Sequence, residues 1–155
     1  MAGPLRSGEI KSKTNLAKKN FAIVVSEWNE EVTEALYEGA VASLIRNGVK
    51  EENIVRKNVP GTFELSLGAL WMAERKDIHA VICLGCVIQG ETPHFNYICQ
   101  AAAYGITKAG IKTRKPVIFG VLTTLSKQQA LDRAGGKYGN KGEESALSAI
   151  RMLEF

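Results

Sequence analysis

The sequence predicts an α/β fold, a three-layer αβα sandwich around a central, mainly four-stranded parallel sheet. Short apolar and β-branched runs alternate with segments that carry apolar residues at helical spacing. The links between them are short, which favours right-handed crossovers with helices on both faces of the sheet. The 155 residues suit a single domain, predicted over residues 20–155 after a basic tail at residues 1–19.

Each element follows from its local pattern. Residues 21–25 are apolar and β-branched, as in a strand that is buried on both faces. From Val32, apolar residues share one helical face as far as Gly48, which suits a helix end. The predicted order is strand 21–25, helix 32–48, strand 54–59, helix 63–74, strand 79–84, a long helix through residues 95–109, strand 117–121, helix 127–133 and helix 141–153.

Composition excludes several classes of protein. Hydrophobic residues make up 45% of the chain and charged residues 23%, as in ordinary globular domains, and no apolar run approaches the roughly 20 residues that cross a bilayer. The tail alone accounts for the net charge of +4, so we interpret it as solvated and expect no nucleic-acid partner. Residues 1–20 contain no apolar block of signal-peptide type, so we expect a cytoplasmic protein.

The three cysteines argue against a disulfide framework. Cys83 and Cys86 have the spacing of a redox or metal pair, but no second pair follows and the only histidines are His79 and His94. Cys83 also lies within an apolar strand. We therefore interpret both cysteines as small buried residues and predict no metal site.

Ligands of an open parallel sheet bind beyond the carboxyl ends of the strands, so the strand-to-helix junctions are the candidate sites. The first junction contains Trp28, where a polar turn would be ordinary. The second contains Thr62, a candidate N-cap, and Glu64 in the first helical turn. Taken singly, Trp28 is better explained as a core residue and Glu64 as a charge favoured by the helix dipole.

The third junction lies at residues 90–94. Thr92 suits an N-cap and Pro93 the first helical position, which places His94 in the first turn. Gly90 lets the backbone approach a ligand, and the free amides of the helix start offer an anion site. A capped helix with an exposed histidine explains this segment equally well.

Residues 133–142 are glycine-rich and contain Arg133 and two lysines. A helix capped by Gly135, a loop and a helix capped by Asn140 with Glu143 completing a capping box explain the backbone. They do not explain the cations. The Walker A pattern fails, because no Ser or Thr follows Lys141. A single phosphate on Arg133 fits better, since a guanidinium binds phosphate oxygens in bidentate fashion.

Four segments in order, residues 59–65, 85–95, 119–124 and 129–142, resemble the lumazine synthases (6,7-dimethyl-8-ribityllumazine synthases), over roughly residues 21–153. The resemblance implies a flavodoxin-like strand order. It also implies the penultimate step of riboflavin synthesis, in which 5-amino-6-(D-ribitylamino)uracil condenses with 3,4-dihydroxy-2-butanone 4-phosphate. The products would be 6,7-dimethyl-8-ribityllumazine, phosphate and water, and no metal or organic cofactor is implied.

The resemblance further implies roles for single residues. His94 would be the catalytic residue that shuttles protons. Trp28, where the family usually has phenylalanine, would stack on the pyrimidine ring. Phe119, Arg133 and Lys141 would reach in from a neighbouring subunit. The implied substrate-binding set is Trp28, Asn29, Gly61, Thr62, Glu64, Cys86, Val87, Ile88, Gly90, Glu91, Thr92, Phe119, Arg133 and Lys141.

Such enzymes form rings, so we expect a homo-oligomer, either a pentamer or a 60-mer of pentamers, with riboflavin synthase as a further partner. The sequence departs from the family pattern at Gln89, where arginine is commoner, at Cys86, where threonine is common, and at Ser66, where proline often stands. None of these departures removes a proposed catalytic group.

Two rival functions remain at this point. A non-catalytic flavin or lumazine carrier on the same scaffold would keep the stacking aromatic but would not need His94 or Arg133. A nucleic-acid-binding protein would use the basic tail, and its binding would fall with salt and with deletion of the tail. The presence of both His94 and Arg133 favours the enzyme.

Overall fold

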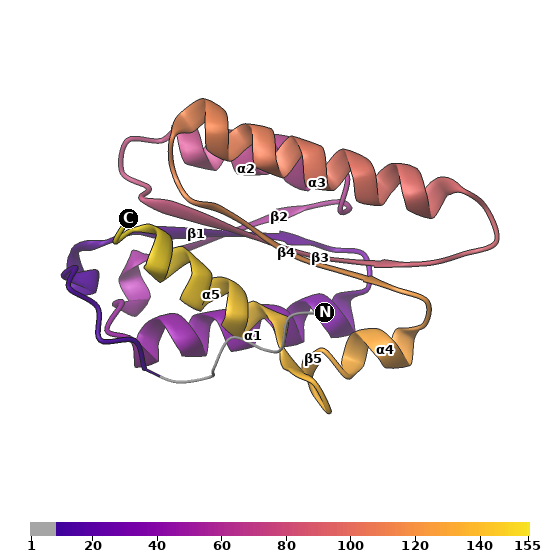
Figure 1. Cartoon of the computed structure of the whole chain (residues 1–155), viewed down its shortest axis with the longest axis horizontal. Coiled ribbons are helices and arrows are strands. Elements are labelled where there is room, and N and C mark those ends of the chain that lie inside the picture. The colour runs from indigo at the N-terminus through magenta and orange to yellow at the C-terminus, as the bar shows by residue number, and fades with distance from the viewer. Residues whose placement is uncertain (1–8) are drawn as a thin grey trace.

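The computed structural model describes residues 9–155; residues 1–8 of the predicted tail lie outside the described part of the chain. The strands β1 (Phe21–Ser26), β2 (Ile54–Val59), β3 (Ala80–Ile88) and β4 (Val117–Thr124) form one sheet. All neighbours are parallel, in the order β2-β1-β3-β4. The predicted four-stranded parallel sheet with flavodoxin-like order is confirmed (Figure 1).

Helices cover both faces of this sheet (Figure 1). On one face lie α1 (Glu30–Arg46) and α5 (Lys141–Met152), with the short α4 (Lys127–Leu131) beside them. On the other face α2 (Leu65–Glu74) packs beside α3 (His94–Thr113). Short 3-10 helices, η1 (Leu16–Lys18) and η2 (Glu51–Asn53), precede β1 and β2. The three-layer αβα prediction is therefore confirmed.

The apolar strands are buried on both faces. Successive side chains of a strand point to opposite faces, so Ile23 and Ile82 join the core under α1 and α5, while Val24 and Val81 join the core under α2 and α3. Full burial of such a side chain contributes roughly 1.5 to 3 kcal/mol. Every residue of β1 is buried, as the run of apolar residues predicted.

Strand β3 in the middle of the sheet and strand β4 at its edge are longer than predicted. β3 continues from Leu84 to Ile88 and β4 from Val121 to Thr124, because the parallel pairing runs on to Ile88 and Thr124. Backbone pairing is not visible in hydropathy, so the ends predicted at Leu84 and Val121 came too early. The extension carries the last residues of β3 to the edge where the strand-to-helix junctions lie.

Residues 133–142 form a hairpin instead of the predicted loop. α4 ends at Leu131, and Gly135 lies in β5 (Ala134–Gly136), which pairs antiparallel with β6 (Gly139–Asn140). Gly135 therefore does not cap the helix. Its φ of +106° still explains the glycine, because a side chain is strained in that conformation.

The predicted N-caps are correct at one helix and wrong at two. The Asn140 side chain accepts the N–H groups of Gly142 (2.8 Å) and Glu143 (3.3 Å), although the Glu143 carboxylate pairs with Arg46 instead of closing a capping box. Thr62 makes no cap, since α2 begins only at Leu65. The helix α3 begins at His94, so Pro93 holds the cap position.

Part of the predicted tail packs on the domain. Leu16 is buried in the core under α1 and α5, and Ile10 packs against the same core. The Ile10 N–H donates to Asn47 Oδ1 (2.7 Å), and the Lys13 N–H donates to Glu154 Oε1 (2.7 Å). The prediction of a solvated tail over residues 1–19 is therefore wrong for residues 10–16, because the side chains of Ile10 and Leu16 pack against the core.

His79 links the amino ends of β1 and β3. Its Nδ1 accepts the N–H of Asn20 (3.0 Å), and its own backbone N–H donates to the Asn20 carbonyl (2.9 Å). Partial burial and the charge of Lys19 lower the pKa of His79 from its usual 6.5; Lys115 acts in the same direction, and the backbone hydrogen bond with Asn20 and the charge of Asp77 act against it. The neutral ring is thus the form that the fold prefers.

We expect this preference to make the fold sensitive to acid. The unfolded chain takes up a proton on His79 at a higher pH than the folded chain, so the contribution of His79 is complete above about pH 6.5 and is lost as pH falls below it. Urea midpoints measured between about pH 7.5 and 5.5 should fall more steeply for the native protein than for His79→Gln, which cannot titrate. Parallel curves would contradict this.

Candidate active site

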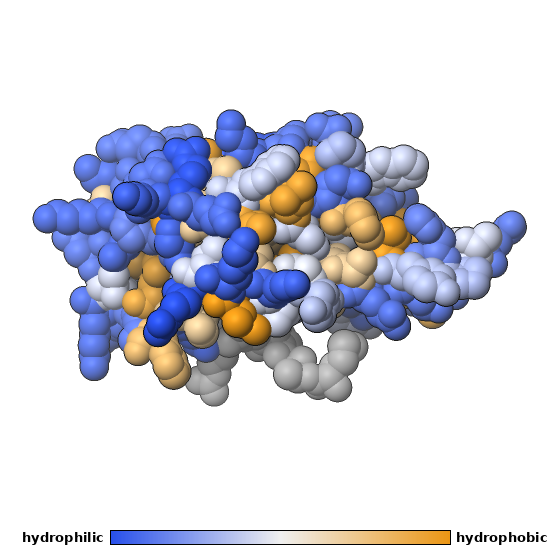
Figure 2. Space-filling view, turned by 90° about the horizontal axis from the view of Figure 1, so that it is seen from above, coloured by the Kyte–Doolittle hydropathy of each residue, from blue (hydrophilic) through white to orange (hydrophobic). Residues whose placement is uncertain are grey.

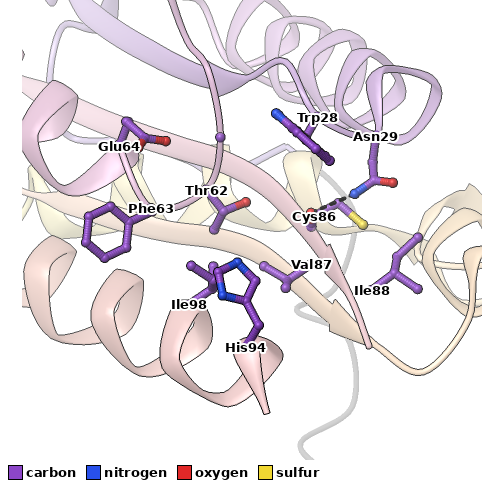
Figure 3. A pocket seen from close by; sticks show the side chains of 11 residues that line it. Trp28, Asn29, Thr62, Phe63, Glu64, Cys86, Val87, Ile88, His94 and Ile98 are labelled. Carbon is purple, nitrogen blue, oxygen red and sulfur yellow. Dashed lines mark hydrogen bonds between the residues drawn. The ribbon is translucent and has the colours of Figure 1, made fainter. Parts of the chain in front are cut away.

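A cavity of about 570 Å³ lies beyond the carboxyl ends of β1 and β3, where the sheet geometry predicted a site. Three segments far apart in the sequence form it: the loop after β1, the loop after β2, and the end of β3 with the start of α3. Figure 3 shows their side chains around the opening. The lining residues are Trp28, Asn29, Gly61, Thr62, Phe63, Glu64, Cys86, Val87, Ile88, His94 and Ile98.

The loop after β1 holds an exposed tryptophan at the rim. Trp28 is 74% exposed, so it is a surface aromatic and not the core residue that its type alone would suggest. Its backbone is fixed from both sides: the Glu27 N–H donates to the Val59 carbonyl (2.9 Å), and Asn29 Nδ2 donates to the Cys86 carbonyl (3.0 Å). Asn29 adopts a left-handed conformation with φ +61°. Such backbone is uncommon outside glycine and occurs often at binding sites.

The loop after β2 brings a carboxylate and a buried hydroxyl to the cavity. Glu64 is exposed and directly precedes α2. Its carboxylate lies close to the backbone of Gly61. Thr62 is buried, and its hydroxyl has no hydrogen-bond partner in residues 9–155; the same holds for Ser26 at the end of β1. An unsatisfied buried hydroxyl costs about 1 to 3 kcal/mol, so this pair needs an explanation.

The end of β3 forms an apolar floor. Cys86, Val87 and Ile88 line the cavity from consecutive positions of the strand. Burial raises the pKa of the Cys86 thiol to about 11 and that of Cys83 to about 12. A thiol with such a pKa stays protonated and is a poor nucleophile, so the prediction of structural cysteines agrees with their surroundings.

His94 is the first residue of α3 and faces the cavity. Figure 3 shows its imidazole beside Ile98 and Val87, across the opening from Trp28. The Thr92 hydroxyl accepts the backbone N–H of His94 at 3.4 Å, a long contact that helps to fix the helix start. An exposed histidine at a helix start can exchange protons with solvent and with a ligand in the cavity.

Comparison with known proteins decides the family. The family model described as 6,7-dimethyl-8-ribityllumazine synthase matches residues 18–155. A protein of that name from Cytophaga hutchinsonii is 63% identical over 147 residues, which is 95% of this chain and 91% of the relative. The one from Parabacteroides distasonis is 52% identical over 147 residues, covering 95% and 92%. The chain belongs to the 6,7-dimethyl-8-ribityllumazine synthase family. A protein of the same name from Flavobacterium johnsoniae is 52% identical over 132 residues, 85% of this chain and 70% of the relative.

The lumazine synthase resemblance predicted fourteen substrate-binding residues besides His94. Of these, the structure brings eight to the cavity with His94: Trp28, Asn29, Gly61, Thr62, Glu64, Cys86, Val87 and Ile88. Gly90, Glu91 and Thr92 lie in the exposed link between β3 and α3, next to the cavity but outside its lining.

Three further predicted residues lie elsewhere on the chain. Phe119 stands on the free edge strand β4 and is 40% exposed. Arg133 donates to the Gln129 carbonyl (2.9 Å) and lies over the Tyr138 ring, 4.9 Å from its centre. Lys141 pairs with Glu144 at 2.6 Å. These are the three residues that the resemblance attributes to a neighbouring subunit of a lumazine synthase.

Two lining residues were missed by sequence reasoning. Phe63 lies between the predicted Thr62 and Glu64 and is exposed at the cavity, whereas the sequence pattern placed it only at the start of the predicted helix 63–74. Ile98 lies one helical turn after His94, so the spacing of four residues was a usable signal. Both give the cavity apolar walls around the polar groups of Asn29, Glu64 and His94.

Two further searches covered residues 9–155 only. In that part of the chain no cluster of three or more His, Cys, Asp or Glu side chains has the geometry to hold a metal ion. None of its helices is both long and apolar enough to span a bilayer.

Proposed function

We propose that this protein joins 5-amino-6-(D-ribitylamino)uracil to 3,4-dihydroxy-2-butanone 4-phosphate and releases 6,7-dimethyl-8-ribityllumazine, phosphate and water. The protein is then a transferase of riboflavin biosynthesis. The observation that carries this proposal is the cavity that gathers Trp28, Glu64 and His94 in a chain of the lumazine synthase family. Each of these residues supplies a group that the reaction needs.

The pyrimidine would bind against Trp28. An indole offers a large flat face, and the ring of the substrate gains most when it is offset-stacked on such a face. The Glu64 carboxylate accepts hydrogen bonds from hydroxyls of the ribityl chain. Asn29 has already given one amide N–H to the Cys86 carbonyl, so its main contribution is to hold the end of β3, where the backbone at residues 86–88 meets the substrate.

His94 would move the protons. Attack of the pyrimidine amine on the ketone forms a Schiff base with loss of water, and loss of phosphate then requires a proton to leave carbon. An imidazole suits both steps, since its ring nitrogens can both donate and accept a proton. Holding both substrates side by side lowers the barrier further, because the reaction becomes effectively unimolecular.

The phosphate would bind at the start of α3. The backbone N–H groups near Gly90 and Glu91, with the Thr92 hydroxyl, form the polar end of a long helix. Arg133 adds the bidentate donor. Its guanidinium forms no ion pair with a carboxylate in residues 9–155, so it keeps its charge for an external anion.

We propose a homopentameric ring in which each site is built by two chains. Phe119, Arg133 and Lys141 would complete a neighbour's cavity, Phe119 as an apolar wall and Lys141 as an electrostatic support. The outer face of α2 and α3 supports a subunit interface, because it exposes Leu67, Trp71, Tyr97, Tyr104 and Ile111. Figure 2, seen from this side, shows hydrophobic residues gathered among hydrophilic ones. A head-to-tail contact gives a ring if the rotation closes and an open filament if it does not.

The proposal extends to the assembly and the compartment. The short hairpin of β5 and β6 is compact, which suits assembly of pentamers into a 60-subunit icosahedral shell, with riboflavin synthase as the partner that uses the product. The free thiols of Cys83, Cys86 and Cys99 suit the reducing cytoplasm.

The proposed reaction is tested by incubating the purified protein with both substrates. Lumazine fluorescence should appear only when the protein, the pyrimidine and the butanone phosphate are all present, with phosphate released in equal amount. Calorimetry of the pyrimidine alone serves as the parallel measurement. Binding of the pyrimidine without product formation would contradict the proposed reaction and favour the alternative function, a non-catalytic flavin or lumazine carrier.

A further inference from the structure

One asparagine ties the hairpin of β5 and β6 to the helix α1. Asn140 ends this hairpin and pairs with Ala134 across it. Its Nδ2 donates to the Ala35 carbonyl of α1 at 2.9 Å, over a separation of 105 positions in the chain. Its Oδ1 accepts the N–H groups of Gly142 and Glu143 at the start of α5. A single side chain therefore joins the hairpin, α1 and α5.

The surroundings of Asn140 fix its side-chain amide in one orientation. The start of α5 offers two donors and the Ala35 carbonyl is an acceptor, so an exchange of the amide oxygen and nitrogen would break all three contacts. The helix α1 leaves a notch at Gly39, where a Cβ atom would lie 2.5 Å from the Asn140 amide. The start of α5 lies so close to α1 that a Cβ atom at Gly142 would collide with the Leu36 carbonyl. These two glycines let the Asn140 side chain reach α1.

The hairpin that Asn140 holds also carries Arg133. The Lys141 N–H donates to the Arg133 carbonyl at 2.9 Å, so the chain is closed directly beside the pair formed by Ala134 and Asn140. The Arg133 guanidinium lies over the Tyr138 ring of the same hairpin. Residues 135–139 are exposed, whereas Ala134 is buried and Asn140 is partly buried. The base of the hairpin therefore sets the place of both the Arg133 backbone and the ring under its guanidinium.

We propose that Asn140 is a positioning residue for phosphate binding, which anchors the hairpin to α1 and so holds the Arg133 guanidinium where the butanone phosphate binds. Asn140 itself touches no substrate. A guanidinium binds a phosphate through two parallel N–H groups, so a shift of the segment that carries it weakens both hydrogen bonds together. The inference rests on the proposed function and deepens it, since Arg133 is the proposed phosphate donor.

Asn140→Ser separates the anchor from the helix cap. A serine hydroxyl still accepts an N–H group at the start of α5, but it is too short to reach the Ala35 carbonyl, and it adds no charge near the phosphate. The KM for the butanone phosphate should rise by about 10-fold, as expected when one hydrogen bond that places the phosphate donor is lost. The kcat at saturation and the KM for the pyrimidine should stay within about 2-fold of the native values.

Two further variants test the route of the effect. Gly39→Ala fills the notch from the side of α1, so the Asn140 amide is displaced although every hairpin residue is native. It should raise the KM for the butanone phosphate as Asn140→Ser does, even though alanine favours a helix more than glycine. In the Arg133→Ala background, Asn140→Ser should raise this KM no further, because the residue through which it acts is gone.

Asn47→Ser is the matched control for a purely structural effect. Asn47 lies at the carboxyl end of α1, and its Nδ2 also donates to a carbonyl of that helix, Ser43, at 2.8 Å. Its Oδ1 accepts a backbone N–H group as well, that of Ile10 at 2.7 Å. Asn47→Ser should lower the urea midpoint about as much as Asn140→Ser does, because similar contacts are lost. It should leave the KM for the butanone phosphate unchanged.

Two measurements need no turnover. Amide exchange of the free protein should show less protection of the Lys141 N–H, which closes the hairpin, in Asn140→Ser and Gly39→Ala than in the native protein. The amides of β1 should keep their native protection. The calorimetric Kd for inorganic phosphate should rise in both variants by about the same factor as the KM for the butanone phosphate.

Several outcomes would overturn the inference. A native KM for the butanone phosphate in Asn140→Ser would make Asn140 a structural residue only, whether or not Lys141 loses protection. A raised KM with native protection, an equal rise in Asn47→Ser, or effects of Asn140→Ser and Arg133→Ala that multiply would each exclude action through the hairpin and Arg133. Weaker phosphate binding in the variants of a protein that forms no lumazine would leave the inference standing and overturn the proposed reaction. A native protein that neither binds phosphate nor forms lumazine would overturn both.

Discussion

Replacing His94 with alanine is expected to lower kcat by about 10²- to 10⁴-fold, the range typical for a lost general acid or base. The reason lies in its position. His94 is exposed at the first turn of α3 with its ring at the cavity, so the residue contributes little to packing. The fold should therefore persist, with an unchanged urea midpoint and unchanged ring size.

Two comparisons make this result specific. Asn96→Ala lies in the same helical turn, is also exposed and does not line the cavity, so it should keep native turnover. The pyrimidine should still bind His94→Ala, because stacking on Trp28 does not use the imidazole. Native turnover in His94→Ala would remove this residue from the mechanism, and loss of folding would make it a structural residue.

The second large effect is expected at Arg133. Arg133→Ala should raise the KM for the butanone phosphate by one to two powers of ten, since it removes the only proposed bidentate phosphate donor; charge-assisted hydrogen bonds are worth about 1.5 to 3 kcal/mol each. The KM for the pyrimidine should change little. Lys137→Ala is the matched control, a cation on the same hairpin that we assign no contact with substrate.

A mixing experiment tests whether Arg133 acts on a neighbour's site. Chains carrying His94→Ala and chains carrying Arg133→Ala are unfolded, mixed equally and refolded together. In a randomly mixed ring about a quarter of the sites combine a native His94 with a native Arg133, so activity should return to about a quarter of the native level. Each parent refolded alone should stay inactive at low butanone phosphate. A mixed ring as inactive as its parents would exclude a shared site.

The layers of the fold and most of the cavity could be predicted from the sequence. An apolar strand such as residues 21–25 is buried on both faces only if helices cover both faces of the sheet. Parallel strands also bring their carboxyl ends to one edge of the sheet. Trp28, Glu64 and His94 each follow such an end, so their meeting at one cavity followed from topology. The Asn140 cap was predictable for a local reason, because its partners lie two and three residues away.

Other features depended on contacts between residues distant in the sequence. The hairpin of β5 and β6 replaced the predicted loop because Ala134 pairs with Asn140, and the side chain of Asn140 also donates to the Ala35 carbonyl across the domain. Burial of Leu16 and Ile10 drew part of the basic tail onto the core. Charge and local hydropathy contain no information on which distant surface is free to receive such a segment.

Sequence by itself determined the αβα architecture through its periodicity, and its motifs carried the family resemblance that implied the eight residues found around the cavity with His94. Tertiary structure alone decided that Thr62 caps no helix. Its hydroxyl is instead buried beside Gly85, without a hydrogen-bond partner in residues 9–155. Thr62 lies in the loop after β2 and Gly85 lies on β3, and the two come close only when the parallel strands have paired in register and α2 has packed over them.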